Sequence, residues 1–127
     1  MKKVITWGKF DRLHKGHISF LKNAKKLGIL YVIIVSSKSK CYKNCIKNSD
    51  LIRKKNLLKL KFIEDVFITK SFNEGIKYII KLSPDIYVFG HDQKVSKIKN
   101  YLSKNKCFPK YKRLKVYNKG IHNKDLF

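Results

Sequence analysis

Residues 4–17 read VITWGKFDRLHKGH, a short apolar run that leads through a glycine-containing turn into two histidines. Val4–Trp7 predicts a strand, because an apolar run without alternation is typical of the centre of a parallel sheet. Beyond the histidines, apolar residues recur at helical spacing as far as Leu27, and Gly28 is placed to end that helix. The β-branched run Tyr31–Val35 predicts a second buried strand. These residues together predict a strand–helix–strand unit.

The same alternation continues along the chain. It predicts a Rossmann-like three-layer α/β/α sandwich, whose five-stranded parallel sheet has the strand order 3-2-1-4-5 and right-handed crossovers. A chain of 127 residues suffices for one core, so we expect a single domain over residues 1–127. The further helices are expected over Ser49–Leu60 with Ser49 as N-cap, Asn73–Leu82 and Val95–Asn105, and the further strands over Asp65–Ile68, Ile86–Phe89 and Arg113–Val116.

The charge balance is strongly basic. Lys and Arg number 31 against 8 Asp and Glu, which gives a formal net charge of +23. Such a charge attracts nucleic acids, anionic membranes and phosphorylated metabolites alike, so it does not choose among them. The lysines are spread among many Asn and Ile residues, whose codons are also AT-rich. We therefore favour genome base composition over a dedicated nucleic-acid surface, and keep a basic nucleic-acid-binding protein as the non-enzymatic alternative.

The cysteines and the apolar runs argue against several other classes of protein. Cys41, Cys45 and Cys107 form an odd number without CxxC spacing, which favours reduced thiols over a disulfide framework and over a zinc site. No apolar stretch has the length of a signal-peptide core or of a membrane span. We therefore expect a cytoplasmic protein with no membrane partner and no metal site built from its own side chains.

The turn between the first strand and the first helix contains residues suited to phosphate chemistry. In a parallel sheet, ligands bind beyond the carboxyl ends of the strands, beside the first strand. Gly8 permits a tight turn there, and Gly16 lets the backbone approach a ligand at a helix N-terminus, where unpaired N–H groups favour phosphate. His14 and His17 flank that point and can donate hydrogen bonds to an α-phosphate as charge develops. Histidine pairs are more often structural, but this setting favours catalysis by both side chains.

A family signature is present in this turn. The sequence GKFD at residues 8–11, followed by HKGH at residues 14–17, resembles the GxFDxxHxGH signature of cytidylyltransferase-like nucleotidyltransferases. These enzymes transfer a nucleoside monophosphate from a nucleoside triphosphate to a phosphorylated acceptor and release pyrophosphate. The resemblance implies that Asp11 braces the loop, and its structural alternative is to cap a helix N-terminus. For Phe10, the structural alternative to a place in the nucleotide site is that its ring plugs the core. The nucleotide-binding residues that it implies are Lys9 and Phe10 through their backbone, His14, Lys15, Gly16, His17 and Asp92.

Four further residues are candidates for binding the phosphates. Arg53, on the second expected helix, matches a family arginine and has a surface helix arginine as its alternative. Lys43 lies in the loop after the second strand, where the family often places triphosphate-binding lysines, and a solvated lysine is the alternative. Lys119 and His122 lie in the tail, where GIHNK at residues 120–124 replaces the Gly-Ile-Ser-Thr-Thr segment of the family. Their N–H donors can substitute for the missing hydroxyls.

The end of the fourth expected strand indicates the acceptor. Residues 90–93 read GHDQ, which resembles archaeal-type FAD synthases, whereas glycerol-3-phosphate cytidylyltransferases tend to have Gly-Asp-Asp-Trp there. The resemblance implies ATP and FMN as substrates, a role in FAD biosynthesis as a flavin-binding protein, and Mg²⁺ or another divalent cation bound to the triphosphate. CTP with glycerol 3-phosphate, or a sugar phosphate as acceptor, are the alternatives. A homodimer is left open.

Overall fold

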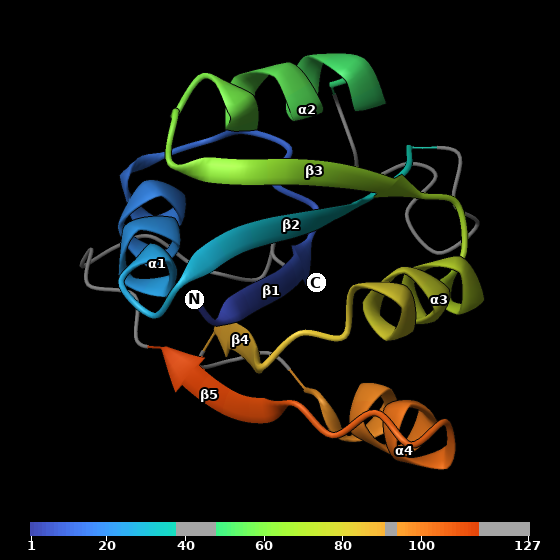
Figure 1. Ribbon diagram of the computed structural model, residues 1–127. Coiled ribbons are helices and arrows are strands. Elements are labelled where there is room, and N and C mark those ends of the chain that lie inside the picture. The colour runs from blue at the N-terminus through green and yellow to red at the C-terminus, as the bar shows by residue number, and fades with distance from the viewer. Residues whose placement is uncertain (38–47, 91–93, 115–127) are drawn as a thin grey trace.

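The sheet consists of five parallel strands in the described part of the chain: β1 (Lys3–Gly8), β2 (Ile29–Val35), β3 (Ile63–Thr69), β4 (Ile86–Gly90) and β5 (Lys110–Leu114). This computed structural model describes residues 1–37, 48–90 and 94–114. The strands follow the order β3-β2-β1-β4-β5, with β1 at the centre between β2 and β4 (Figure 1). The predicted strand order and parallel pairing are confirmed.

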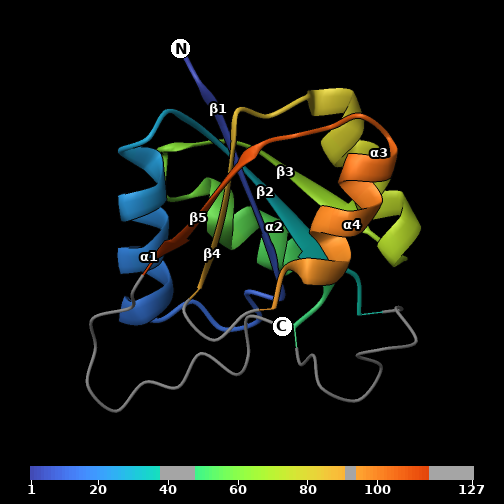
Figure 2. The ribbon, with the colours of Figure 1, turned by 90° about the horizontal axis from the view of Figure 1, so that it is seen from below.

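The helices of the described residues are α1 (Lys15–Lys25), α2 (Asp50–Leu58), α3 (Phe72–Leu82) and α4 (Ser96–Lys104). α1 and α2 pack on one face of the sheet, and α3 and α4 pack on the other, as Figure 1 and Figure 2 show. The predicted three-layer sandwich is therefore confirmed. In the same ranges, no helix has both the length and the apolar character that crossing a bilayer requires.

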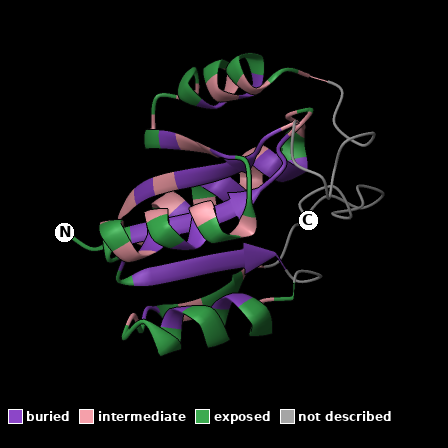
Figure 3. Ribbon diagram, turned by 90° about the vertical axis from the view of Figure 1, so that its right-hand side faces the viewer, coloured by how far each residue is buried: buried purple, intermediate pink, exposed green. Residues whose placement is uncertain are grey.

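The core has two apolar layers, one on each face of the sheet. Successive residues of β1 contribute to opposite layers, so Val4 packs with α1 and α2 whereas Ile5 and Trp7 pack with α3 and α4. Figure 3 shows the buried residues concentrated in the strands between the helices. Burial on both faces explains why β1 and β2 are apolar along nearly their whole length and do not alternate with polar residues.

The expected helices and strands are present with small shifts at their ends, and one strand differs more. Ser49 caps α2 as predicted, because its hydroxyl accepts a backbone N–H of the first turn at 3.3 Å. The predicted fifth strand is present, but it begins at Lys110 and not at the predicted Arg113. The predicted end at Val116 lies outside the described residues. β5 is an edge strand in which Tyr111 and Leu114 pack against the two layers. Its position is set by pairing with β4 and not by a local apolar pattern.

α3 approaches β1 closely at a glycine. The Trp7 ring stacks on Phe72 with 5.6 Å between ring centroids, and it also lies against Gly75. A Cβ added at Gly75 would overlap the Trp7 ring, which is only 3% exposed and so has little room to move aside. Packing therefore requires glycine here, although glycine inside a helix is about 1 kcal/mol less favourable than alanine.

We expect Gly75→Ala to lower the free energy of unfolding by about 1–3 kcal/mol, because the overlap with Trp7 outweighs the gain in helix propensity. Lys77→Ala, at an exposed position of the same helix, is the control and should change this free energy by about 0.5 kcal/mol or less. Urea denaturation of the two variants measures both values. A Gly75→Ala protein more stable than its parent would contradict the packing described for α3.

Candidate active site

The chain turns sharply after β1 to place the motif beside the sheet. Phe10 has a φ of 46°, in the left-handed region that costs a bulky residue about 1–2 kcal/mol. Its ring is 1% exposed and packs in the layer beneath α1 and α2, which confirms the core-plug alternative. The preceding carbonyl, that of Lys9, accepts a hydrogen bond from Arg53 at 2.9 Å. The turn is therefore held both by burial of an aromatic ring and by a buried cation.

His14 is the N-cap of α1. Its backbone is extended, and its Nδ1 accepts the backbone N–H groups of Gly16 at 3.1 Å and of His17 at 3.3 Å. Two expectations are corrected here, because Asp11 is not the cap and the N–H groups of Gly16 and His17 are not unpaired. A ring nitrogen that accepts hydrogen bonds carries no proton, so neutral His14 has its proton on Nε2. The helix N-terminus thus presents a side-chain donor in place of two backbone donors.

The His17 ring has the opposite arrangement. Its Nδ1 lies 3.0 Å from the carbonyl oxygen of Arg12, and because a carbonyl only accepts, this nitrogen carries the proton. The ring is 1% exposed and stacks on His14 with 3.7 Å between centroids, while Phe10 meets it edge to face at 5.5 Å. Neutral His17 therefore has a lone pair at Nε2 and donates there only as the imidazolium. The two stacked histidines are chemically distinct.

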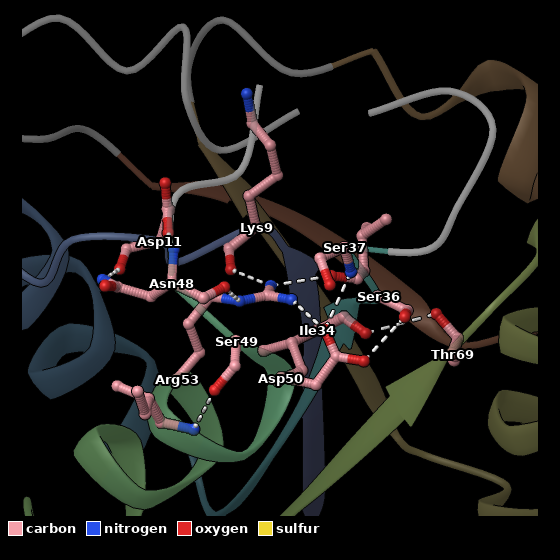
Figure 4. Close-up of polar contacts among 12 residues, drawn as sticks. Lys9, Asp11, Ile34, Ser36, Ser37, Asn48, Ser49, Asp50, Arg53 and Thr69 are labelled. Carbon is pink, nitrogen blue, oxygen red and sulfur yellow. Dashed lines mark hydrogen bonds and ion pairs between the residues drawn. The ribbon is translucent and has the colours of Figure 1, made fainter. Parts of the chain in front are cut away.

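Arg53 of α2 is completely buried and ties together the ends of three elements (Figure 4). Its Nη1 donates to the carbonyl of Lys9 after β1, at 2.9 Å, and to the carbonyl of Val35 at the end of β2, at 2.7 Å. Its Nε donates to the carbonyl of Asn48, just before α2, at 3.2 Å. The alternative of a surface helix arginine is wrong. These contacts support a positioning role, and phosphate binding by Arg53 stays a prediction.

Asp50 supplies the negative charge that the buried Arg53 needs. Its Oδ1 lies 2.6 Å from Nη2 of Arg53, and its carboxylate also accepts from the Ser36 hydroxyl at 2.7 Å and from the Ser37 N–H at 2.8 Å. Partial burial by itself raises the pKa of Asp50. The hydrogen bonds from Ser36 and Ser37, together with the charge of Arg53, outweigh it and hold the pKa below its ordinary value of 3.8. The carboxylate is thus ionised at neutral pH.

Asp11 braces the loop, as the resemblance implies. Its Oδ1 accepts the backbone N–H of Asn48 at 2.8 Å, and its carbonyl accepts the Asn48 side-chain amide at 2.6 Å. Asn48 in turn offers its own carbonyl to Arg53. The motif loop and the segment that enters α2 are therefore joined by a continuous set of hydrogen bonds.

The predicted nucleotide-binding residues of the motif lie on one segment, from the end of β1 into the first turn of α1. Lys15 is exposed there and Gly16 is buried. The Lys9 side chain is mostly buried, and Figure 4 shows it pointing away from the Arg53 guanidinium. The predictions for Lys43, Asp92, Lys119 and His122 fall on residues outside the described ranges.

Sequence reasoning missed the partners of Arg53. Asp50 could have been found, because an Asp three residues before an Arg on a helix is a known ion-pair spacing. Asn48 and Ser36 carry no local signal, since each is joined to residues distant in the sequence. These residues do not touch the reacting groups in any contact described above, but they fix the loop that carries the two histidines.

A parallel sheet in this order, with two imidazoles at the N-terminus of the helix that follows its central strand, is the arrangement that the resemblance implied for a nucleotidyltransferase. The chain belongs to the cytidylyltransferase-like family, whose model matches residues 5–122. The family resemblance in the sequence is therefore confirmed.

Similar proteins carry two different names within this class. The chain is 32% identical to the FAD synthase of Methanobrevibacter smithii, over 99% of this chain and 84% of that protein. It is 35% identical to the glycerol-3-phosphate cytidylyltransferase of Bacillus subtilis, over 72% of this chain and 73% of that protein. A solved structure, the lipopolysaccharide core biosynthesis protein from Thermoplasma volcanium, superposes with a TM-score of 0.82 at 28% identity, covering 93% of this chain and 99% of that one. The solved structure shares the fold, and the two named relatives are both nucleotidyltransferases.

Among the described residues, no group of three or more His, Cys, Asp and Glu side chains is placed to hold a metal ion. Magnesium commonly binds through substrate phosphates with few protein ligands, so a site of this kind needs no such group. Cations on the protein and the helix N-terminus are suited to the triphosphate itself.

We expect two substitutions of His14 to show that its Nδ1 caps the helix. Asparagine can accept backbone N–H groups as an N-cap, so His14→Asn should leave the free energy of unfolding within about 0.5 kcal/mol, whereas His14→Ala should lower it by about 1 kcal/mol. Urea denaturation at neutral pH measures both. Equal stability of the two variants would contradict the capping role of Nδ1.

The Asp50–Arg53 pair should also make stability depend on pH. Because the folded state lowers the pKa of Asp50, its contribution is complete at neutral pH and is lost as the pH falls below about 3.8. Asp50→Asn should cost up to about 3 kcal/mol at pH 7, because it leaves a buried guanidinium without its counter-charge, and should show a smaller further loss in acid. Denaturation between pH 7 and pH 3 tests this, with the exposed Glu64→Gln as control. Parallel acid profiles for Asp50→Asn and Glu64→Gln would contradict the assignment.

Proposed function

We propose that this chain is an FMN adenylyltransferase, which joins the AMP moiety of ATP to FMN and releases pyrophosphate. The name of the Methanobrevibacter smithii relative, which matches 99% of this chain, supports ATP and FMN as substrates. A second FAD synthase, from Thermococcus sibiricus, is 37% identical over 80% of this chain. The stacked His14–His17 pair at the start of α1 carries the nucleotidyl-transfer chemistry, and the names of these two relatives support the choice of ATP and FMN.

In this reaction a phosphate oxygen of FMN attacks the α-phosphorus of ATP. A P–O bond forms there as the bond to the β-phosphate breaks, and pyrophosphate leaves with its electron pair. The attacking phosphate is already an anion near neutral pH, so no general base has to remove a proton. The task of the protein is to hold the phosphates and to stabilise the charge that gathers on the α-phosphate oxygens.

The two histidines are suited to different parts of that task. His14 donates from Nε2 while neutral, and the two backbone N–H groups on its Nδ1 polarise the ring so that this donor is strengthened. His17 donates from Nε2 only when it is protonated, because in the neutral ring its one proton is on Nδ1, directed to the Arg12 carbonyl. Two cations stacked at 3.7 Å would repel each other.

Other residues of the chain hold this arrangement. Arg53 and Asp50 position the loop, and the strained turn at Phe10 keeps an aromatic edge against His17. Magnesium bound to the triphosphate would neutralise charge on its oxygens. A cytoplasmic location and a homodimer stay predictions.

A glycerol-3-phosphate cytidylyltransferase is the second candidate. The Bacillus subtilis relative favours it, at 35% identity over 72% of this chain. Both enzymes would use the same histidine pair and differ in nucleotide and acceptor. Transfer to a sugar phosphate is the third candidate, on the same chemistry.

We expect the purified protein to form FAD and pyrophosphate from ATP, FMN and magnesium, with little turnover of CTP and glycerol 3-phosphate. Chromatography of the flavins and a pyrophosphate assay measure both reactions. Turnover of CTP and glycerol 3-phosphate without FAD would assign the second candidate.

His14→Asn keeps the cap but has no donor in the place of Nε2, so it should lose about 10²-fold or more in turnover while remaining folded. His17→Ala should lose a similar factor. A fully active His14→Asn enzyme would overturn the role proposed for this ring.

A further inference from the structure

A cavity lies on the face of the sheet opposite to the histidine pair. Its volume is about 280 Å³, and the residues that line it come from three elements: Lys3 of β1, Phe67 of β3, and Tyr78, Lys81 and Leu82 of α3. α3 packs on one face of the sheet, whereas α1, which begins at the histidines, packs on the other (Figure 1). The cavity is therefore separate from the site described above, and nucleotidyl transfer does not use it.

Stacked aromatic rings form the apolar part of this cavity. Phe67 stacks on Tyr78 with 5.2 Å between ring centroids and 11° between ring planes. Tyr31 of β2 stacks on Phe67 in turn, at 6.2 Å and 5°. These three rings are half-buried, whereas Ile5 and Ile33 of the same core layer are completely buried. Solvent therefore reaches a row of nearly parallel aromatic rings at this point of the surface.

Two lysines supply positive charge at the cavity. Lys3 donates from Nζ to the carbonyl of Leu82 at 3.2 Å, and so compensates the negative C-terminal end of α3. The carboxylate of Asp85 accepts the backbone N–H of Lys3 at 2.8 Å and does not line the cavity. The Lys81 side chain is exposed and has no hydrogen bond or ion pair within the described part of the chain. Its charge is therefore available to a bound anion.

A second copy of this chain is a poorer occupant than a small ligand. β3 is an edge strand, and exposed charges such as its Glu64 and Asp65 oppose pairing between the edges of two sheets. In a two-fold interface the lysines of one copy would also face those of the other, and a formal net charge of +23 opposes that approach. The same charge attracts a small anion.

We propose that this cavity binds a planar aromatic ring that carries an anionic group. The ring stacks on Phe67 and Tyr78, as nucleobases stack on aromatic side chains, and the anion meets Nζ of Lys81. Ligand pockets begin at about 300 Å³, so a volume of about 280 Å³ suits one ring system and not a dinucleotide. Nucleoside monophosphates and FMN share this chemistry.

NMR distinguishes this cavity from the histidine loop residue by residue. Uniformly ¹⁵N-labelled protein is titrated with AMP and, separately, with FMN, and the backbone amide shifts are followed. We expect saturable shifts at residues 66–68 and 77–83, with a binding curve that differs from that of any shifts at residues 8–17. The ligand with the lower dissociation constant at the cavity identifies the source of the ring. Shifts at residues 8–17 alone, with both ligands, would overturn the proposal.

Two pairs of substitutions test the aromatic and the cationic contact. Tyr78→Leu should raise the dissociation constant at the cavity at least about fivefold, because it removes a stacking ring, whereas Tyr101→Leu, at an exposed tyrosine of α4, should leave it unchanged. Lys81→Gln should raise it about two- to fivefold, whereas Lys77→Gln, one turn earlier on the same helix, should change it by about 1.5-fold or less. The amide spectrum of each free variant shows whether it is folded. Equal effects of the cavity and control substitutions would contradict the assignment.

Ligands that lack one part complete the test. Riboflavin has the flavin ring without the phosphate, and ribose 5-phosphate has the phosphate without a ring. Each should bind the cavity at least about twofold more weakly than FMN or AMP, respectively. Inorganic phosphate that binds as tightly as AMP would show attraction of any anion and would overturn the proposal. Absence of FAD synthesis would bear on the histidine site alone, because the cavity lies on the opposite face of the sheet.

Discussion

The buried guanidinium of Arg53 is the contact on which the arrangement of the site depends. It holds carbonyl groups from the turn after β1, from the end of β2 and from the segment before α2, over separations of up to 44 residues. Burying a cation is costly unless it is paired and hydrogen-bonded, and here Asp50 and the carbonyls meet that requirement. The bond from Nη1 also fixes the Lys9 carbonyl, and this holds the next residue, Phe10, at its positive φ. A surface arginine could not hold these three chain segments in one position.

In the proposed reaction, His14 both caps a helix and binds a phosphate. His14 uses Nδ1 to close the start of α1, and this choice leaves the Nε2 proton for a ligand. His17 takes the other tautomer because the Arg12 carbonyl lies at its Nδ1. The ring stack keeps the two imidazoles against each other. In the proposed reaction, the positive field of the helix N-terminus would act on the phosphate through the His14 imidazole, because the backbone N–H groups of Gly16 and His17 are bonded to its Nδ1.

The acidic residues are unevenly placed among the described elements. α1 and β5 contain none, whereas β3 contains Glu64 and Asp65, and Asp85 lies beside the start of β5, where its carbonyl accepts the Lys110 N–H. A chain with a formal net charge of +23 is drawn to polyanions over its whole surface.

The sequence by itself determined the layered α/β fold, the central place of β1 and the position of the histidine motif. These features follow from apolar periodicity and glycine placement, which are properties of neighbouring residues and can be read without the tertiary structure. It did not determine the start of β5. Few residues of this strand face the core, so its limits depend on pairing with β4. It also could not choose the tautomers of His14 and His17 or the burial of Arg53. Those depend on partners brought close only when the strands assemble, and a carbonyl 44 residues away leaves no trace in local sequence. The tertiary structure therefore decided the tautomers of the two histidines and the burial of Arg53, whereas the sequence decided on which element each residue lies.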